Sequence, residues 1–586
     1  MLRPSGGEKC GLVLAESLRS RRLQAKAAQR LSGNLALVPH SAVSASRWGC
    51  QNLFLPALLC LTASSLLQAQ RPRLMVVVVA EQFRADYLDL YRSGFSADGF
   101  GRLLSEGAVF RRARFKHLTT LGAPNAAVLA TGAYPELHGI VGDRWYDRRI
   151  RKTAAAIAPA GNGPSNSGIS PLNISPLNLS GSTLADELQL ATAGRSRVIA
   201  ISGTAAPAVM LAGRNPDGCY WMGSDGQFGT SSFYAKQLQP WVAEFNASQP
   251  VLRHWGAEWK AIGAKDGAPP LRVLESAERK SFDVFFSLYR ASPFAIEDVF
   301  ALAERAIEAE ELGAGEYTDL FIINLSAPAF LGLETGANSP LMRDLVLQLD
   351  RRLGEFLRVL DEKVGADQVS LVFTAAHGIP PLPERARESG LRAGRVSGDA
   401  VAAAMNSALG EHFGPEVFVE KYLSPFVYLN AAQALTDSQR RRAVQVAGKA
   451  AASVDGVASY YVPGEGSVPE ALRTALRRSW YVPRSGDFML VLDPYFVEDY
   501  ERGRGTSSGS AYRYDTDVPL IFLGPRFKAK RFEREVDAAD VAPTLAAVLE
   551  ISAPSLATGE VLHEALRPPA PHAAGDSQIS GPPSPE

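Results

Sequence analysis

The stretch Gln368-Val369-Ser370-Leu371-Val372-Phe373-Thr374-Ala375-Ala376-His377-Gly378 decides the fold prediction. Its first eight residues are rich in apolar and β-branched side chains, as in a strand that is buried within a sheet. The strand runs into a loop of small residues that carries one histidine. Ligands of open α/β sheets bind just beyond the carboxyl ends of such strands. His377 therefore occupies a position typical of a metal ligand or an acid–base group, although its neighbours Ala375 and Ala376 carry no functional group.

Similar strands recur on both sides of this stretch, with helices between them. Residues 73–80, 197–202 and 319–324 form apolar runs typical of buried strands, whereas residues 183–193, 300–311 and 341–363 have helical periodicity. This alternation predicts an α/β fold with a mostly parallel sheet between two layers of helices. Residues 379–486 are less regular and predict a cap or insertion, and residues 488–492 and 519–523 return to strand character.

The composition is that of an ordinary globular protein. Of the 586 residues, 46% are hydrophobic and 21% are charged, and Lys+Arg and Asp+Glu are both 61, so the formal net charge is zero. A chain without excess positive charge gives no support for a polyanionic partner, so we expect no nucleic acid to bind.

The N-terminal region has the pattern of an export signal. Residues 52–67 form an apolar run preceded by Arg47, and small residues around Ala69 offer a cleavage point. The run is short for a membrane span, although an uncleaved anchor helix remains an alternative. We therefore expect a bacterial-type exported protein, periplasmic or secreted, with membrane contact only through this signal. Residues 1–51 form an N-terminal extension that is long for a signal and suggests a mis-assigned start.

A series of motifs, in order along the chain, carries a family resemblance. They are Glu81-Gln82-Phe83-Arg84-Ala85-Asp86-Tyr87, Gly122-Ala123-Pro124, Thr131-Gly132, His138-Gly139-Ile140, Ser182-Thr183-Leu184-Ala185-Asp186, Phe373-Thr374-Ala375-Ala376-His377-Gly378, Gly505-Thr506-Ser507-Ser508-Gly509-Ser510, Tyr514-Asp515-Thr516-Asp517-Val518-Pro519 and Asp540-Val541-Ala542-Pro543-Thr544. Together they resemble the alkaline phosphatase superfamily, in particular its bacterial type I phosphodiesterase/nucleotide pyrophosphatase-like branch. The resemblance implies a three-layer α/β/α sandwich over residues 70–566. Residues 567–586 are rich in Pro, Ala, Ser and Gly, a composition that predicts a disordered tail.

The resemblance also implies a chemistry that this chain is poorly equipped to perform. Enzymes of the family use a Thr or Ser nucleophile and two zinc ions, which hold the attacking and leaving oxygens of an in-line displacement. The nucleophile precedes Ala-Pro in the family, and the corresponding residue here is Gly122. The ligand positions of one zinc correspond to Ala329, Leu333 and Ser508, none of which is a usual ligand.

The second zinc position and the phosphate clamp are also altered. The ligand positions of this zinc correspond to Glu81, Ala376 and His377, so two potential ligands remain. The clamp's Lys and Arg correspond to Thr204 and Ala206. Its phosphate-binding Asn corresponds to Asp143, whose negative charge would repel a phosphoryl oxygen.

Several alternative roles stay open at this stage. Glu81 and His377 could hold a single metal, or they could be a remnant in which His377 is hydrogen-bonded to the backbone. Replacement ligands could come from His138, Asp515 and Asp517, and replacement nucleophiles from Ser326, Ser507 and Ser508. A Ser-His-Asp arrangement around His377 has no supporting Gly-x-Ser-x-Gly motif.

We therefore expect a pseudoenzyme that lacks the two-metal site and the nucleophile, requires no cofactor, and binds an unknown small molecule or protein. The alternative is a zinc-dependent phosphate monoester or diester hydrolase with rearranged ligands. A third reading is a hydrolase with a new chemistry at the same strand ends. The hydrolase with rearranged ligands would be favoured if three or more of these side chains lay within metal-bonding distance of one point: Glu81, Asp143, His377, Asp515 and Asp517.

Overall fold

A computed structural model describes residues 71–159, 174–275, 281–430, 435–464, 468–500 and 502–567. The expected extension, the signal over residues 52–69 and nearly all of the expected tail lie outside these residues. None of the helices in the described ranges is both long enough and apolar enough to cross a membrane.

A nine-stranded mixed sheet forms the centre of the described chain. In spatial order its strands are β21 (Lys530–Asp537), β2 (Ala108–Arg114), β20 (Asp517–Leu523), β13 (Val369–Ala375), β1 (Leu74–Ala80), β12 (Asp319–Leu325), β7 (Val198–Ser202), β8 (Gly218–Met222) and β9 (Phe228–Gly229). The five strands from β13 to β8 run parallel, whereas β20 and β9 pair antiparallel to their neighbours. The mostly parallel sheet confirms the predicted fold class.

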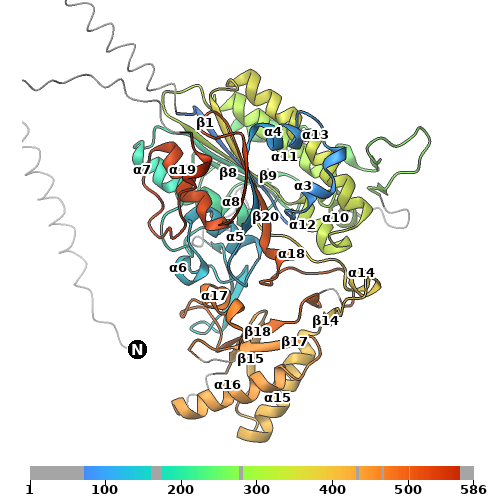
Figure 1. Cartoon of the computed structure of the whole chain (residues 1–586), viewed down its shortest axis with the longest axis vertical. Coiled ribbons are helices and arrows are strands. Elements are labelled where there is room, and N and C mark those ends of the chain that lie inside the picture. The colour runs from blue at the N-terminus through green and yellow to red at the C-terminus, as the bar shows by residue number, and fades with distance from the viewer. Residues whose placement is uncertain are drawn as a thin grey trace, which may run out of the picture. The chain divides into compact units, whose positions relative to one another are not determined.

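Helices cover both faces of this sheet (Figure 1). One layer contains α5 (Gly122–Thr131), α7 (Leu184–Ala191), α8 (Ala205–Ala212) and α19 (Val541–Leu549). The other contains α3 (Tyr87–Leu90), α4 (Phe100–Glu106), α10 (Phe282–Arg290), α11 (Pro293–Ala309), α12 (Ala327–Thr335) and α13 (Pro340–Lys363). Because both faces are covered, every residue of β1, β12 and β13 is buried.

The cap is a second structured region in the same compact unit, built from residues 383–498. Its elements are α14 (Pro383–Glu388), β14 (Gly394–Val396), α15 (Gly398–Phe413), β15 (Val419–Leu423), β16 (Phe426–Leu429), α16 (Asp437–Ala451), β17 (Val457–Tyr461), α17 (Glu470–Arg478), β18 (Phe488–Leu492) and β19 (Phe496–Glu498). Strands β15, β16, β18 and β17 form an antiparallel sheet that shares a small apolar core with α15 and α16.

The regularity of the cap differs from the expectation. Residues 379–486 were expected to be less regular, but they contain helices and strands, and residues 488–492 pair within the cap sheet as β18. The strands of the cap sheet have only four or five residues each. So few residues give a weak periodic signal, so these strands carry little pattern in the sequence.

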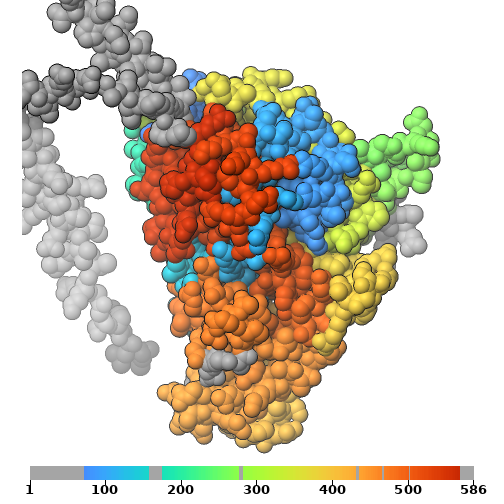
Figure 2. Space-filling model, viewed as in Figure 1, coloured from blue at the N-terminus to red at the C-terminus, as the bar shows by residue number. Residues whose placement is uncertain are grey.

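Shorter elements complete the described chain. They are η1 (Arg92–Gly94), α6 (Pro135–His138), β3 (Arg144–Asp147), β4 (Lys152–Ala155), β5 (Ala158–Pro159), β6 (Ile174–Ser175), α9 (Pro240–Ala247), η2 (Leu252–His254), β10 (Glu258–Trp259), β11 (Arg272–Val273), α18 (Arg513–Thr516), η3 (Ala538–Asp540) and η4 (His563–Ala565). In the space-filling view, blue N-terminal and red C-terminal residues share one face, as the pairing of β2 with β20 and β21 requires (Figure 2).

Candidate functional site

The candidate site lies at the carboxyl ends of four parallel strands, where ligands of α/β sheets bind. Glu81 follows β1, Ser326 follows β12, and Ala376 and His377 follow β13. After β7 the chain passes through Gly203 to Thr204, the N-cap residue of α8. Because these strands are adjacent and parallel, the four loops meet at one edge of the sheet.

Glu81 is the centre of a buried polar cluster. Its Oε1 accepts hydrogen bonds from Asn324 Nδ2 at 2.7 Å, from Ser326 Oγ at 2.5 Å and from Thr204 Oγ1 at 3.3 Å. Burial raises the pKa of the Glu81 carboxyl, and the nearby charge of Asp143 raises it further, while the three hydrogen bonds oppose this shift. In the described part of the chain, Glu81 has no cationic partner.

Gly122 begins α5 directly beside this cluster. A Cβ atom at Gly122 would lie 3.6 Å from Glu81 Oε2 and 3.9 Å from Asp143 Oδ1. The same Asp143 oxygen accepts a hydrogen bond from Ala123 N at 2.8 Å, at the first turn of α5. The family nucleophile position is therefore an open space that two carboxylates border.

His377 is buried and points back to its own loop. Its Nδ1 lies 2.8 Å from the carbonyl oxygen of Gly378, which is the backbone contact that the sequence suggested. Burial lowers the pKa of His377 to about 4, so the ring is neutral at physiological pH. Among the described residues it forms no hydrogen bond with a serine or an aspartate, so no Ser-His-Asp triad is present there.

The remaining candidate ligands have other partners. Asp515 Oδ2 accepts hydrogen bonds from Ser510 N and Oγ, and burial raises the pKa of Asp515 to about 8. Asp517 is ion-paired with Arg114 at 2.6 Å. His138 Nδ1 accepts a hydrogen bond from Ile140 N, which stabilises the turn at Gly139.

The candidate replacement nucleophiles differ in their partners, and Ser326 is the one that contacts a described carboxylate. Ser326 Oγ donates to Glu81, and Ser507 Oγ contacts the backbone of Glu498. Two threonines also lie in the loop before Gly122: the Thr119 hydroxyl contacts His117, and the Thr120 hydroxyl donates to the carbonyl of Ser510. Ser508 lines the cleft described next, without a hydrogen bond to a described acid or base.

A cleft of about 850 Å³ joins this strand-end site to the cap. The sequence-predicted positions that line it are Glu81, Gly122, Asp143, Thr204, Ala329, Leu333, His377, Ser507 and Ser508. Ala376, although it corresponds to a ligand, is not part of the lining, and Ala206 lies within α8. The structure therefore brings most of the family positions together around one space.

The cap contributes residues that the sequence did not single out. Asp399 comes from α15, Lys421 and Tyr422 from β15, and Glu498 and Tyr500 from the end of β19 and beyond. Glu498 is buried, accepts a hydrogen bond from the hydroxyl of Tyr422 and has a raised pKa because of its burial. No local signal marked these residues, because their place at the cleft depends on how the cap packs.

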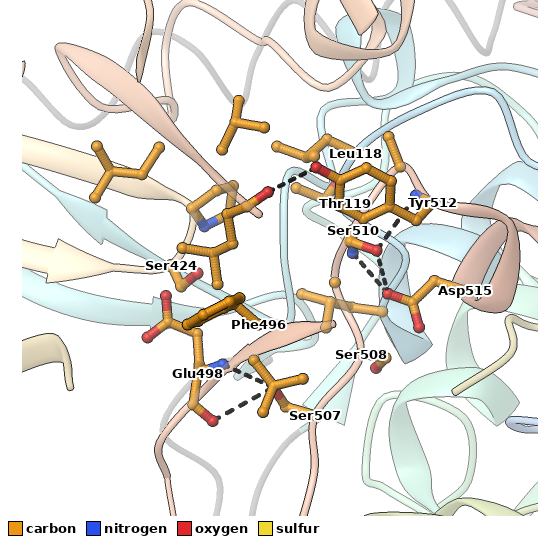
Figure 3. Close-up of a pocket in the computed structure, with 18 of the residues that line it drawn as sticks. Leu118, Thr119, Ser424, Phe496, Glu498, Ser507, Ser508, Ser510, Tyr512 and Asp515 are labelled. Carbon is orange, nitrogen blue, oxygen red and sulfur yellow. Dashed lines mark hydrogen bonds between the residues drawn. The ribbon is translucent and has the colours of Figure 1, made fainter. Parts of the chain in front are cut away.

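A smaller inner pocket adjoins the cleft behind Ser507 and Ser508. Figure 3 shows Ser424, Glu498, Ser510, Tyr512 and Asp515 around it, with Ser510 and Asp515 hydrogen-bonded to each other. Its space of about 40 Å³ is too small for a ring-sized ligand. The larger cleft is therefore the candidate binding site.

The donor set does not fit the two zinc ions of the resembled enzymes. A zinc site needs about three protein ligands, whereas Ala329, Leu333 and Ser508 supply no usual ligand for one ion. Glu81 and His377 are the usual ligand types that remain for the other. Within the described ranges, no group of three or more His, Cys, Asp or Glu side chains has a geometry that could hold a metal.

The sheet order and the strand-end site together define a protein of the alkaline phosphatase superfamily. The family model for type I phosphodiesterase / nucleotide pyrophosphatase matches residues 75–511. The chain belongs to this family, as the sequence motifs predicted.

Characterised relatives align over nearly their whole length. The chain is 29% identical to alkaline phosphatase PafA of Elizabethkingia meningoseptica, over 86% of this chain and 98% of the relative. It is 28% identical to a protein named calcium-transporting ATPase of Myroides odoratus, over 85% of this chain and 95% of the relative. The crystal structure of PafA superposes with a TM-score of 0.77 at 27% identity, covering 85% of this chain and 99% of PafA.

Proposed function

We propose that this chain is a binding protein of the alkaline phosphatase superfamily that has lost two-metal phosphate ester hydrolysis. Gly122 carries the proposal: where a nucleophile would stand, there is no side chain, and the carboxylates of Glu81 and Asp143 face the space instead. Neither side chain carries the hydroxyl that the family uses as its nucleophile, and the negative charge of both would repel an incoming phosphoryl group.

The losses around Gly122 reinforce one another. Single losses of catalytic electrostatics commonly reduce kcat by about two to three orders of magnitude. This chain has no usual ligand at four of the six zinc-ligand positions, and it replaces the nucleophile and the clamp residues at Thr204 and Ala206. We expect the combined effect to leave turnover of phosphate esters at the background rate.

A metal-dependent phosphate monoester or diester hydrolase with rearranged ligands is the second candidate. The named relatives favour it, since alkaline phosphatases align over most of this chain. Arg144 and Lys421 also line the cleft, and neither forms an ion pair with a described residue. These two cations are the groups available to hold a phosphate.

One experiment separates the two candidates. The purified full-length chain is incubated with zinc, analysed for bound metal, and assayed with aryl phosphate monoesters and diesters. The binding-protein proposal predicts no stoichiometric zinc, no rise in melting temperature on zinc addition and no turnover above background. Stoichiometric zinc together with turnover would establish the hydrolase instead.

We also propose export, on the strength of the apolar run at residues 52–67 and the small residues around Ala69. Expression of the full chain in a Gram-negative host, followed by cell fractionation and N-terminal sequencing, tests this proposal. The expected product is periplasmic or secreted and begins near Gln70. Recovery of the uncut chain from the cytoplasm would contradict it.

A further inference from the structure

Glu81 presents one satisfied and one unsatisfied oxygen to the cleft. Its side chain is only 8% exposed, and Oε1 receives all three of its hydrogen bonds. No described residue donates a hydrogen bond or forms an ion pair with Oε2. Oε2 instead borders the space above Gly122, where a Cβ would lie 3.6 Å away.

Asp143 borders the same space. Its Oδ1 would lie 3.9 Å from that Cβ, and its one hydrogen bond from a described residue comes from Ala123 N. Asp143 is exposed, so it adds a second negative charge beside Glu81 rather than a buried one. Glu81 is the nearly buried carboxylate, and a buried carboxylate without a cation is costly unless a partner compensates its charge. The space between the two carboxylates is therefore suited to a positively charged group.

The rest of the cleft lining also contains more carboxylates than cationic side chains. Asp399, Glu498 and Asp499 add carboxylates, and none of the three is ion-paired with a described cation. Glu420 is different, because Arg151 forms an ion pair with it at 2.9 Å and takes up its charge. The cationic residues Arg144 and Lys421 are outnumbered, so the cleft favours cations over anions.

Aromatic rings complete the lining. Phe330 and Tyr422 line the cleft, and so does Tyr500, which is 67% exposed. Aromatic faces attract organic cations, and they also pack against the apolar part of such a ligand. A ligand that combines an ammonium group with an apolar body would use both features.

We propose that the cleft binds a small organic amine, whose primary ammonium group lies above Gly122 between Glu81 and Asp143. This inference rests on the proposed function, since a zinc ion at Glu81 would occupy the same place. The ammonium group would donate one N–H to Glu81 Oε2 and one to Asp143 Oδ1, and its charge would compensate theirs. A cleft of about 850 Å³ leaves room for the rest of such a molecule.

Three probes of matched shape and different charge test the proposal by calorimetry on the full chain. They are 2-phenylethylamine, the neutral 2-phenylethanol and the anionic phenyl phosphate. We expect the amine to bind about tenfold or more tightly than the alcohol, because hydrogen bonds between charged groups are the stronger kind. Phenyl phosphate should show no measurable binding.

Variants of the cleft carboxylates then test where the amine binds. Glu81→Gln and Asp143→Asn should each weaken 2-phenylethylamine about tenfold, whereas Glu420→Gln, which removes a carboxylate already paired with Arg151, should change affinity less than about twofold. Equal binding of amine and alcohol, tighter binding of phenyl phosphate, absence of amine binding, or indifference to both Glu81→Gln and Asp143→Asn would overturn the proposal.

The amine-binding and zinc measurements together separate failure of the ligand assignment from failure of the proposed function. If the amine does not bind and the chain neither holds zinc nor hydrolyses aryl phosphates, the ligand assignment is wrong and the binding-protein proposal stands. If zinc binds stoichiometrically, supports turnover and displaces the amine, the proposed function fails as well.

Discussion

At the scale of single residues, Glu81 behaves as a buried carboxylate that the protein itself does not neutralise. Asn324, Ser326 and Thr204 satisfy one of its oxygens, but burial still raises its pKa. An ordinary enzyme of the superfamily would place a metal ion beside this position. Here the hydrogen-bond donors to Glu81 are neutral, so a substitution that removes the negative charge of Glu81 can keep those hydrogen bonds.

Glu81→Gln should therefore be neutral or stabilising, because the amide oxygen can accept the same three hydrogen bonds. Glu81→Ala should lower the free energy of unfolding by about 1–3 kcal/mol, because it leaves buried donors of Asn324 and Ser326 unpaired. Urea unfolding of both variants at neutral pH measures the difference. Equal destabilisation by the two variants would show that the negative charge itself stabilises the fold.

Asp515 provides a pH-dependent test. Burial raises its pKa from 3.8 to about 8, so the folded chain binds this proton more tightly than the unfolded chain does. Its contribution to stability is therefore present at low pH and is lost as the pH rises from about 4 to about 8. Asp515→Asn should remove this part of the pH dependence, with a slope change of up to about 1.4 kcal/mol per pH unit.

The Asn side chain suits this position because its oxygen can keep the hydrogen bonds that Asp515 Oδ2 receives from Ser510. Chemical unfolding at a series of pH values between 5 and 8 gives the slope. The neighbouring Asp517→Asn variant, which removes the partner of Arg114, is the control and should keep the wild-type slope. An unchanged slope in Asp515→Asn would mean that this carboxyl is already ionised at pH 5.

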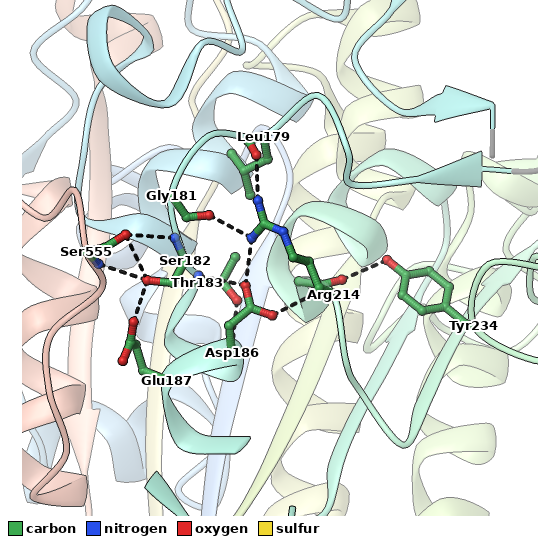
Figure 4. A network of polar contacts seen from close by, with 10 residues as sticks. Leu179, Gly181, Ser182, Thr183, Asp186, Glu187, Arg214, Tyr234 and Ser555 are labelled. Carbon is green, nitrogen blue, oxygen red and sulfur yellow. Dashed lines mark hydrogen bonds and ion pairs between the residues drawn. The ribbon is translucent and has the colours of Figure 1, made fainter. Parts of the chain in front are cut away.

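At the scale of elements, the start of α7 shows how a short helix is held in the outer layer. Thr183 Oγ1 accepts a hydrogen bond from Asp186 N at 3.1 Å, and Asp186 Oδ2 accepts one from Thr183 N at 3.0 Å, which makes a capping box. Asp186 also forms an ion pair with Arg214, whose guanidinium donates to the carbonyls of Leu179 and Gly181 (Figure 4). One aspartate thus connects the helix start with two loops.

Thr183→Ala should lower the free energy of unfolding by about 1 kcal/mol, the usual loss for an N-cap hydroxyl. Asp186→Ala should cost more, because it also removes the partner of Arg214. Thr183→Ser keeps the hydroxyl and serves as the control, with little change expected. Urea denaturation of the three variants tests this order, and a larger loss for Thr183→Ala than for Asp186→Ala would contradict it.

At the scale of the whole molecule, the scaffold of the superfamily is retained. The chain superposes on PafA with a TM-score of 0.77, and the strand ends that carry the family positions meet at one cleft. The cap closes this cleft with its own carboxylates and tyrosines. In the binding protein that we propose, the chemistry of this space has changed while the space itself is retained.

A combined variant tests whether the scaffold can still hold metal. It carries Gly122→Thr, Ala329→Asp, Leu333→His, Ala376→Asp and Ser508→His. Because the backbone positions are retained, we expect this variant to bind one or more zinc ions per chain, as measured by elemental analysis, whereas the parent does not. The Cβ of the new Thr would have no heavy atom nearer than 3.6 Å, apart from its chain neighbours and the backbone of its own helix. Failure of a folded variant to bind zinc would show that the ligand positions no longer converge.

The strongly patterned elements were predictable from sequence. The stretch at residues 368–378 is β13 followed by its loop, and the helix expected at residues 341–363 is α13 (Pro340–Lys363). The start of α11 was missed: it begins at Pro293 rather than near Phe300. Proline at the first helical position after Ser292 is a known start signal, but apolar periodicity alone did not reveal it.

By itself, the sequence determined the α/β fold and the family, and it predicted which residues stand at the nucleophile and ligand positions. These depend on local periodicity and on motifs whose members are close together in the chain. Only the tertiary structure decided that Glu81 Oε2 and Asp143 Oδ1 face one space above Gly122, and that Glu498 and Tyr500 reach the same cleft. Such contacts join residues far apart in the chain, and their geometry follows from the packing of the cap and helices on the sheet, which no local pattern encodes.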